Sequence, residues 1–274
     1  MNDVDRENYT HLAEMAYTRR VRLQSITVQP GSEIAADNAY LNPVKRTFEE
    51  YVWQFLGSAI DHLRLIGEAG SRQPVTNPFA FATLARTAIT TTATALWSLD
   101  SNQATRRVRI LEVIAKDYAS YEDYRRTVEP KFTSPEEVRK FDDETQELNR
   151  RASWLLAEYK SATGKTPTKL KSIGADVTDT LMVKAAGNFL DPAPFTNGLG
   201  PDAELLSMWQ HLSGYAHGRP WAYQGAKTTI GPADANGQAP QTISGQPTTI
   251  ISAAAAVLTL MDTAFDTADR LSDV

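Results

Sequence analysis

Apolar side chains recur along most of this chain at intervals of three and four residues, which is the spacing of one face of an α-helix. Residues 44–69 carry the clearest example, with apolar positions at Phe48, Val52, Phe55, Leu56, Ile60, Leu63 and Ile66. Together with capping residues and prolines, this pattern predicts about eight helices. They cover residues 3–26, 44–69, 77–99, 102–128, 134–162, 176–189, 201–217 and 248–272. The sequence therefore predicts an all-α protein built as a helical bundle.

Segments rich in glycine and proline separate the helices. Residues 27–43 are expected to form a loop, and so are residues 191–200. Residues 222–247 hold four glycines and three prolines, with short Thr/Ile runs near 227–230 and 241–244. We expect a long loop there, or a small hairpin, that serves as a lid or as a surface for a protein partner.

No internal repeat and no clear boundary divides the chain, so residues 1–274 are expected to form a single domain. Residues 1–43 would be an N-terminal arm made of one helix and a loop, and residues 44–221 would be the bundle core. The long loop 222–247 would lead into a C-terminal helix within 248–274.

Composition places the chain among soluble globular proteins, with 42% hydrophobic and 22% charged residues. The net charge of −5 argues against a general coat for nucleic acid, although a local basic face is compatible with it. The absence of cysteine excludes disulfides, thiolate metal sites and cysteine nucleophiles.

The ends of the chain bear on its location. The start, Met1–Arg6, is polar and acidic, unlike a signal peptide. The longest mainly apolar run, at 250–261, has about 12 residues, whereas a membrane helix needs roughly 20. We therefore expect a cytoplasmic protein with no membrane contact.

The segment Leu212–Trp221 holds the first candidate site. Its helix is predicted to end on His217, followed by Gly218 as a cap. The partial negative charge of the last carbonyl groups would favour an imidazolium at this position. Ser213 lies four residues earlier on the same face and would be able to hydrogen-bond the imidazole. The simpler interpretation is a terminal histidine that caps the helix, with Gly218 and Pro220 as its stop.

His211 lies six residues before His217, which is about 120° around the helix. The two rings are therefore badly placed to bind one metal ion, and no acidic residue stands at a matching spacing. We expect neither a metal site nor a cofactor.

Arg86 is the second candidate, because it interrupts the nearly all-apolar run Phe79–Ile89. An arginine in such a helix pairs with a carboxylate or lines a polar cleft. Asp61 is a reasonable partner if it faces inward. Arg86 is thus either half of a structural ion pair or a group that binds anions.

Two further motifs have plain structural interpretations. Gly164-Lys165-Thr166 looks like the end of a phosphate-binding loop, but Tyr159 stands where such a loop needs glycine. Gly164 is therefore expected to cap a helix.

The arginine clusters Arg106-Arg107-Arg109, Arg125-Arg126 and Arg150-Arg151 are expected to lie on solvated helix faces. For the first cluster, Arg106-Arg107-Arg109, an alternative is that it forms part of a surface that faces RNA.

The segments Leu84–Ala88, Ala95–Asp100 and Leu212–Gly218 together resemble those of a family of bacterial α-helical proteins that is distantly similar to the HEPN superfamily. The resemblance extends over about 45–220 and implies a helical bundle. It also implies a homodimer that cleaves RNA without metal, using an arginine and a histidine, in phage defence or a toxin system.

In that superfamily the arginine and the histidine lie in one helix. Here no arginine precedes His217 in its helix, and Thr90 stands where related proteins carry a carboxylate four residues after the arginine. The resemblance therefore requires Arg86 and His217 to converge in the fold, within about 6 Å in an open cleft.

Our leading hypothesis is a HEPN-like protein that acts on RNA or nucleotides, with Arg86 holding phosphate and His217 as general acid or base. Ser213 or Tyr215 would orient the imidazole. Further binding residues would be Asp61, His211 and Arg219.

The alternative hypothesis is a non-catalytic interaction module. In it Arg86, Asp61 and His217 form a buried polar network, and loop 222–247 or the apolar helix faces bind a protein. A homo-oligomer is expected under the leading hypothesis.

Overall fold

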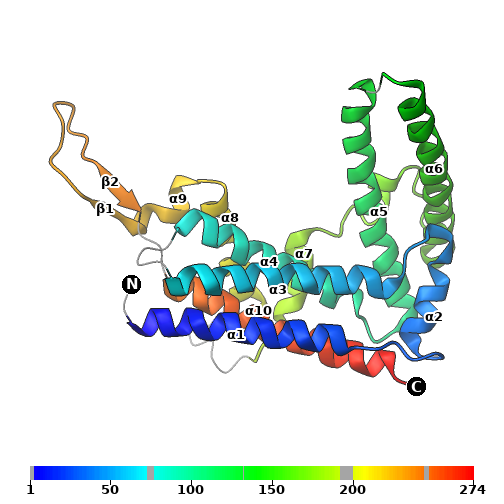
Figure 1. Ribbon diagram of the computed structural model, residues 1–274, viewed down its shortest axis with the longest axis horizontal. Coiled ribbons are helices and arrows are strands. Elements are labelled where there is room, and N and C mark those ends of the chain that lie inside the picture. Colours follow the sequence, from blue (N-terminus) through cyan, green and yellow to red (C-terminus); the bar gives the residue numbers. More distant parts are fainter. Residues whose placement is uncertain (1–2, 73–76, 132, 192–199, 244–246) are drawn as a thin grey trace. The chain divides into compact units, whose positions relative to one another are not determined.

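A computed structural model describes residues 3–72, 77–131, 133–191, 200–243 and 247–274. Within these ranges it contains ten α-helices and one two-stranded sheet, so the predicted all-α class is confirmed (Figure 1). The helices are α1 (Asp3–Ser25), α2 (Glu33–Tyr40), α3 (Phe48–Arg72), α4 (Pro78–Ser98), α5 (Gln103–Val128), α6 (Pro135–Thr163), α7 (Asp179–Gly187), α8 (Pro201–Ala216), α9 (Pro220–Tyr223) and α10 (Pro247–Ser272). The strands are β1 (Lys227–Thr229) and β2 (Gln241–Ile243).

Every predicted helix is present, and the two additional ones are short. Helix α2 lies inside the segment that was expected to be a loop, and Ser32 caps it by accepting a hydrogen bond from the N–H of Ala35 at 3.2 Å. Helix α9 begins at Pro220, directly after the predicted stop of α8. Elements of eight and four residues are too short to show a periodic apolar face. The predicted loop 191–200 lies mainly outside the described residues.

The chain divides into two compact units, so the prediction of a single bundle is too simple. Unit 1 contains residues 1–27, 53–97 and 179–269, and unit 2 contains 28–52, 98–178 and 270–274. Each unit is assembled from separated stretches of chain. No change in local composition can mark such a boundary, because the chain crosses it inside helices and short loops.

Unit 1 includes the N-terminal helix as a packed element, which corrects the prediction of an arm. Tyr9 of α1 is fully buried against α3, where a Cβ at Gly70 would lie 2.4 Å from the tyrosine ring. Arg19 and Arg22 of α1 pair with carboxylates of α10, with the Arg19 Nη2–Asp262 Oδ2 distance at 2.6 Å. Helix α1 is therefore held on two sides.

Helix α10 is long and apolar enough to cross a membrane, by length and composition. Half of its most apolar window is buried within the protein. Its last turns also carry Asp262, Asp266 and Asp269, which form the ion pairs with α1. A helix that is packed in a protein core has the same length and composition.

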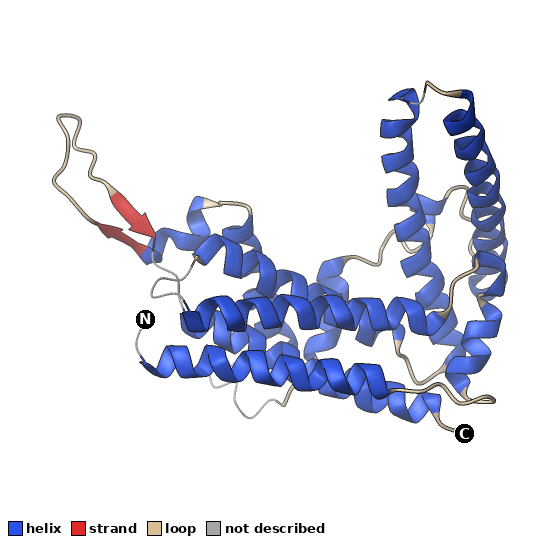
Figure 2. Cartoon of the chain, in the orientation of Figure 1, coloured by secondary structure: helices blue, strands red, loops and turns tan. Residues whose placement is uncertain are grey.

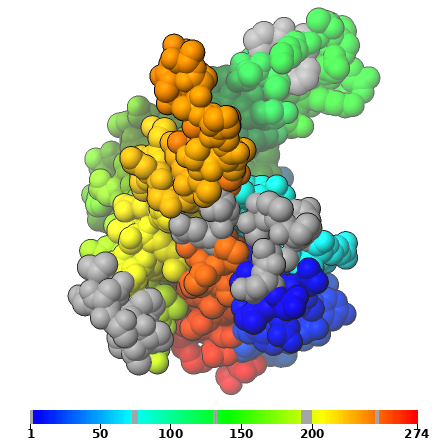
Figure 3. All heavy atoms as spheres, turned by 90° about the vertical axis from the view of Figure 1, so that its left-hand side faces the viewer, coloured from blue at the N-terminus to red at the C-terminus, as the bar shows by residue number. Residues whose placement is uncertain are grey.

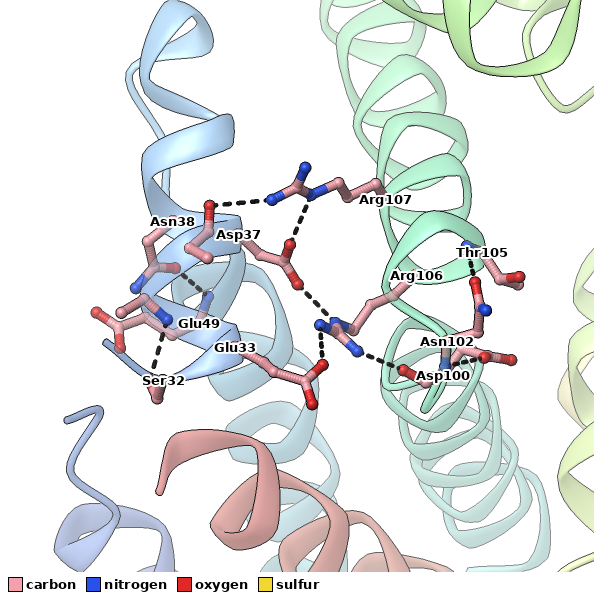
Figure 4. Close-up of polar contacts among 12 residues, drawn as sticks. Ser32, Glu33, Asp37, Asn38, Glu49, Asp100, Asn102, Thr105, Arg106 and Arg107 are labelled. Atoms are coloured by element: carbon pink, nitrogen blue, oxygen red, sulfur yellow. Dashed lines mark hydrogen bonds and ion pairs between the residues drawn. The ribbon is translucent and has the colours of Figure 1, made fainter. Parts of the chain in front are cut away.

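Unit 2 is organised around a buried arginine (Figure 4). Arg106 of α5 is fully buried, and its Nε donates to Oδ2 of Asp37 at 2.6 Å. Its Nη2 donates to Glu33 at 2.8 Å and its Nη1 to the carbonyl of Asp100 at 2.8 Å. The buried Asp37 also accepts from Nε of Arg107. Arg106 was expected on a solvated face or an RNA-facing surface, and both expectations are wrong for this residue.

Helices α5 and α6 also pack together through a buried carboxyl group in unit 2. Tyr159 of α6 donates its hydroxyl to Glu112 of α5 at 3.2 Å. Desolvation by burial raises the pKa of the Glu112 carboxyl above its ordinary value. Gly174, with φ +58°, packs against the aliphatic part of the Glu112 side chain, since a Cβ there would be 2.8 Å from Cβ of Glu112.

The ends of α6 follow the sequence signals. Ser134 and Glu137 form a capping box at its start. Gly164 caps its end with φ +72°, so the Gly-Lys-Thr motif is a helix end, as predicted.

Strands β1 and β2 form a small antiparallel hairpin in unit 1, with Lys227 paired to Ile243 (Figure 2). Of the two structures expected for 222–247, the hairpin is therefore the correct one, at the predicted Thr/Ile runs. It stands out from the helices of its own unit, as the orange atoms in Figure 3 show.

Candidate functional site

The C-terminus of α8 positions His217. The N–H of Gly218 bonds the carbonyl of Tyr215 at 2.9 Å, and the N–H of Arg219 bonds that of Gly214 at 2.8 Å. With Gly218 at φ +63°, this is a Schellman motif, the glycine-capped end that the sequence predicts. Backbone N–H groups thus satisfy these carbonyls, and the His217 side chain is exposed.

Helix α4 meets α8 at Arg86. Its Nε donates to Oγ of Ser213 at 2.7 Å, and its guanidinium carbon lies 5.1 Å from the ring centre of Trp209. Ser213 in turn donates to the carbonyl of Trp209 at 2.8 Å. The single hydroxyl proton of Ser213 is therefore used within α8, and the hydroxyl oxygen holds Arg86. The expected hydrogen bond from Ser213 to the imidazole of His217 is absent.

Thr90 completes this contact between α4 and α8. The indole N–H of Trp209 donates to Oγ1 of Thr90 at 2.8 Å, and Thr90 donates to the carbonyl of Arg86 at 3.0 Å. The pairs Thr90–Trp209 and Arg86–Ser213 show that the two helices run antiparallel here. Thr90 thus has a structural role, because it joins the backbone of α4 to the indole of α8.

The expected pairing of Arg86 with Asp61 is wrong. Asp61 of α3 pairs with Arg20 of α1 at 2.8 Å, and both side chains are about half exposed. Among the described residues, no carboxylate forms an ion pair with Arg86. A half-buried cation held by a hydroxyl and an aromatic ring keeps donors for an anionic ligand.

Arg86 and His217 both bond to Ser213: Nε of Arg86 donates to its hydroxyl at 2.7 Å, and the backbone N–H of His217 donates to its carbonyl at 3.1 Å. Ser213 precedes His217 by four residues, which is about one helical turn or 6 Å along the axis. Within the described part of the chain, no hydrogen bond joins Arg86 to His217 directly. The fold thus brings Arg86 to the turn of α8 that leads into His217, while a direct meeting of the two side chains stays a prediction.

Tyr215 and His211 lie on the other side of α8 and do not orient His217, which corrects the expectation for Tyr215. Tyr215 is 5% exposed, burial raises the pKa of its hydroxyl, and its ring packs edge-on against His211. His211 Nε2 lies 2.8 Å from the carbonyl of Ala222, so this nitrogen carries the proton and donates. Both residues also line a small, mainly apolar pocket with Ala82 and Ile250. His211 therefore fastens α9 to α8.

Trp221 is a feature of this surface that the sequence pattern did not single out. Its side chain is 59% exposed, and part of its indole lies on Gly214, where a Cβ would be 2.8 Å from the ring. The available signal was Gly214 inside the last turn of α8, since a glycine within a helix marks a close approach by another group. Arg219, a predicted binding residue, is exposed at the start of α9 beside Trp221.

The charge of this region differs from that of the whole chain. Residues 205–233 contain no aspartate or glutamate, whereas the chain has a net charge of −5. The same stretch holds His211, His217, Arg219 and Lys227. The end of α8, α9 and β1 thus present cationic groups and no carboxylate of their own.

The described residues contain no cluster of three or more histidine, aspartate or glutamate side chains that would hold a metal ion. No family model matches the chain, and no curated protein or solved structure is significantly similar to it. The geometry of the site therefore carries the functional argument.

Proposed function

We propose that unit 1 binds RNA at the end of α8 and cleaves it without a metal ion, through His217 and Arg86. The observation that carries the proposal is the contact of Arg86, from α4, with Ser213, one turn before the exposed His217. The absence of carboxylates from residues 205–233 supports an anionic ligand.

Each residue has a distinct role in the proposed reaction. The ribose 2′-hydroxyl attacks the neighbouring phosphorus, and the imidazole of His217 takes its proton. The bond to the 5′-oxygen breaks, and water protonates that oxygen. The products are a 2′,3′-cyclic phosphate and a 5′-hydroxyl. The Nη groups of Arg86 stabilise the charge on the phosphate oxygens, while Ser213 positions the guanidinium through its Nε.

The test is cleavage and binding of labelled RNA in the presence of EDTA. We expect His217→Ala to abolish cleavage and keep binding, and Arg86→Gln to weaken both. The matched controls are His11→Ala, whose side chain is 71% exposed on α1, and Arg64→Gln, which is 53% exposed on α3. Cleavage that survives His217→Ala would exclude His217 as the catalytic group.

The resemblance to the HEPN superfamily extends this proposal to a defence or toxin role in the bacterial cytoplasm. Induced expression in a bacterial host would then stop growth, and His217→Ala would relieve the arrest. Equal toxicity of both proteins at equal expression would contradict this role.

A second candidate function is protein interaction through the hairpin. Its strands are exposed and, among the described residues, pair only with each other, and Ile230 beside β1 is 64% exposed. Free strand edges favour pairing with another strand, here that of a second copy. Light scattering should then show a dimer that Ile230→Lys weakens, and a concentration-independent monomer would exclude it.

A further inference from the structure

We propose that Trp221 is a stacking platform for an unpaired base, so that the site takes single-stranded rather than double-stranded RNA. This inference rests on the proposed RNA site and names the form of its substrate. Three observations support it: the exposure of Trp221, its packing between α8 and α9, and its position relative to His217.

The exposure of Trp221 sets it apart from the other tryptophans. Trp209 is 9% exposed, and Trp53, Trp97 and Trp154 are each partly buried, whereas Trp221 is 59% exposed. A tryptophan in water keeps a large apolar surface hydrated, which folding normally removes. The ring is therefore available to a flat partner.

Trp221 lies where α8 and α9 pack closely together. A Cβ at Gly214 would lie 2.5 Å from Cβ of Ala222 and 2.8 Å from the Trp221 ring, so glycine is required for α9 to lie this close to α8. His211 bonds the carbonyl of Ala222 on the same short helix. Packing of one edge of the ring on Gly214 limits its orientations, which lowers the cost of ordering it when a base stacks on it.

Position links Trp221 to the proposed site. Gly214 precedes His217 by three residues and Ser213 precedes it by four, so they lie on either side of His217 on the helix surface, about 100° apart. The Trp221 ring packs on Gly214, and Arg86 donates a hydrogen bond to Ser213. The Trp221 ring, whose centre also lies 6.4 Å from that of the His211 ring, is thus on the side of His217 away from Arg86, where a base adjoining a phosphate bound at His217 would lie.

The surrounding charge fits a nucleic-acid backbone. Arg219 is exposed next to Trp221, and Nζ of Lys227 lies 5.5 Å from the ring centre of Tyr223. With no carboxylate in residues 205–233, these cations face no acidic residue of their own segment. Single-strand binding sites combine such cations with aromatic rings. In a duplex, by contrast, the base faces are stacked on one another and not open to the indole.

The first experiment compares binding of a labelled RNA single strand with binding of the same strand annealed to its complement. We expect Trp221→Ala to weaken single-strand binding at least about fivefold and to leave the weaker duplex binding unchanged. Trp221→Phe keeps a stacking ring and should bind nearly as the native protein does. The control is Tyr124→Ala on α5, which removes an aromatic side chain that is 61% exposed elsewhere.

The second experiment uses fluorescence. Iodide should quench the exposed indole of Trp221, the single strand should protect it, and Trp221→Phe should lack the protected signal. Single-strand binding that Trp221→Ala leaves unchanged, or iodide quenching that RNA does not alter, overturns the stacking role alone. Tryptophan-dependent binding without cleavage supports stacking and contradicts only the catalytic proposal. If no RNA binds at all, both the RNA site and the stacking role are overturned. Both are also overturned if Trp221 joins two copies of the chain and binds no RNA.

Discussion

Arg106 of unit 2 and Arg86 of unit 1 are both arginines on long helices with buried apolar faces, yet their surroundings are opposite. Arg106 is fully buried, and its three nitrogens bond Asp37, Glu33 and a backbone carbonyl. Arg86 is partly exposed and bonds one serine hydroxyl beside an aromatic ring. A buried guanidinium needs charged partners, because desolvation is costly, whereas a partly hydrated one does not.

The difference separates a structural arginine from one that can bind a ligand. In unit 2 the hydrogen-bonding capacity of the guanidinium is used inside the protein. In unit 1 a neutral hydroxyl orients the cation and leaves its charge unpaired among the described residues. The same side chain thus joins helices through ion pairs in one unit and keeps an unpaired charge in the other, which is the charge that the proposed site uses.

The largest expected effect is on Arg106. Arg106→Ala leaves Asp37 buried with Arg107 as its remaining partner, and we expect a loss of about 3–5 kcal/mol in the free energy of unfolding. Urea denaturation measures this. The double variant Arg106→Met/Asp37→Leu should recover most of the loss, because it removes both charges. A loss below about 1 kcal/mol in the single variant would contradict the structural role of Arg106.

Glu112 of unit 2 is a buried acid, as Arg106 is a buried cation. Its pKa is raised by burial, so the folded state favours the protonated form. Stability should therefore fall as the pH rises from the ordinary pKa of 4.5 through the raised one, and Glu112→Gln should remove this fall. The measurement is the unfolding free energy of both proteins from pH 4 to pH 8. Parallel curves would mean that the carboxyl group is hydrated.

Arg86→Gln should change stability by about 1 kcal/mol or less, since it removes one hydrogen bond and one cation–π contact at a partly exposed position. RNA binding should nevertheless weaken and lose part of its salt dependence. A destabilisation as large as that of Arg106→Ala would make Arg86 a structural residue too.

The smallest effect on stability is expected for His217→Ala. The imidazole is exposed and the last turn of α8 is bonded by backbone groups, so unfolding should change by less than about 0.5 kcal/mol. Calorimetry can measure this next to the cleavage assay. A large shift in the melting temperature would show that His217 is a structural cap, as the simpler interpretation of the sequence holds.

Local signals in the sequence were sufficient for the helical class, for the eight longer helices and for the glycine-capped ends at Gly164 and Gly218. They also placed the two strands at the Thr/Ile runs near 227–230 and 241–244. Apolar spacing, capping and left-handed glycines act within about one or two turns of chain, so a single sequence records them. Helix α2 was not predicted, because its eight residues show too little apolar periodicity.

The tertiary structure alone decided which charged residue has which partner. Arg106 meets Asp37 across 69 positions, and Arg86 meets Ser213 across 127. Asp61 pairs with Arg20 and not with Arg86, and Trp221 lies against Gly214 through the turn between α8 and α9. Each of these contacts depends on how whole helices pack, and residues of equal composition become buried or exposed accordingly. The sequence by itself therefore determined the helices and their ends, and the packing of those helices determined which arginine is buried among carboxylates and which stays partly exposed.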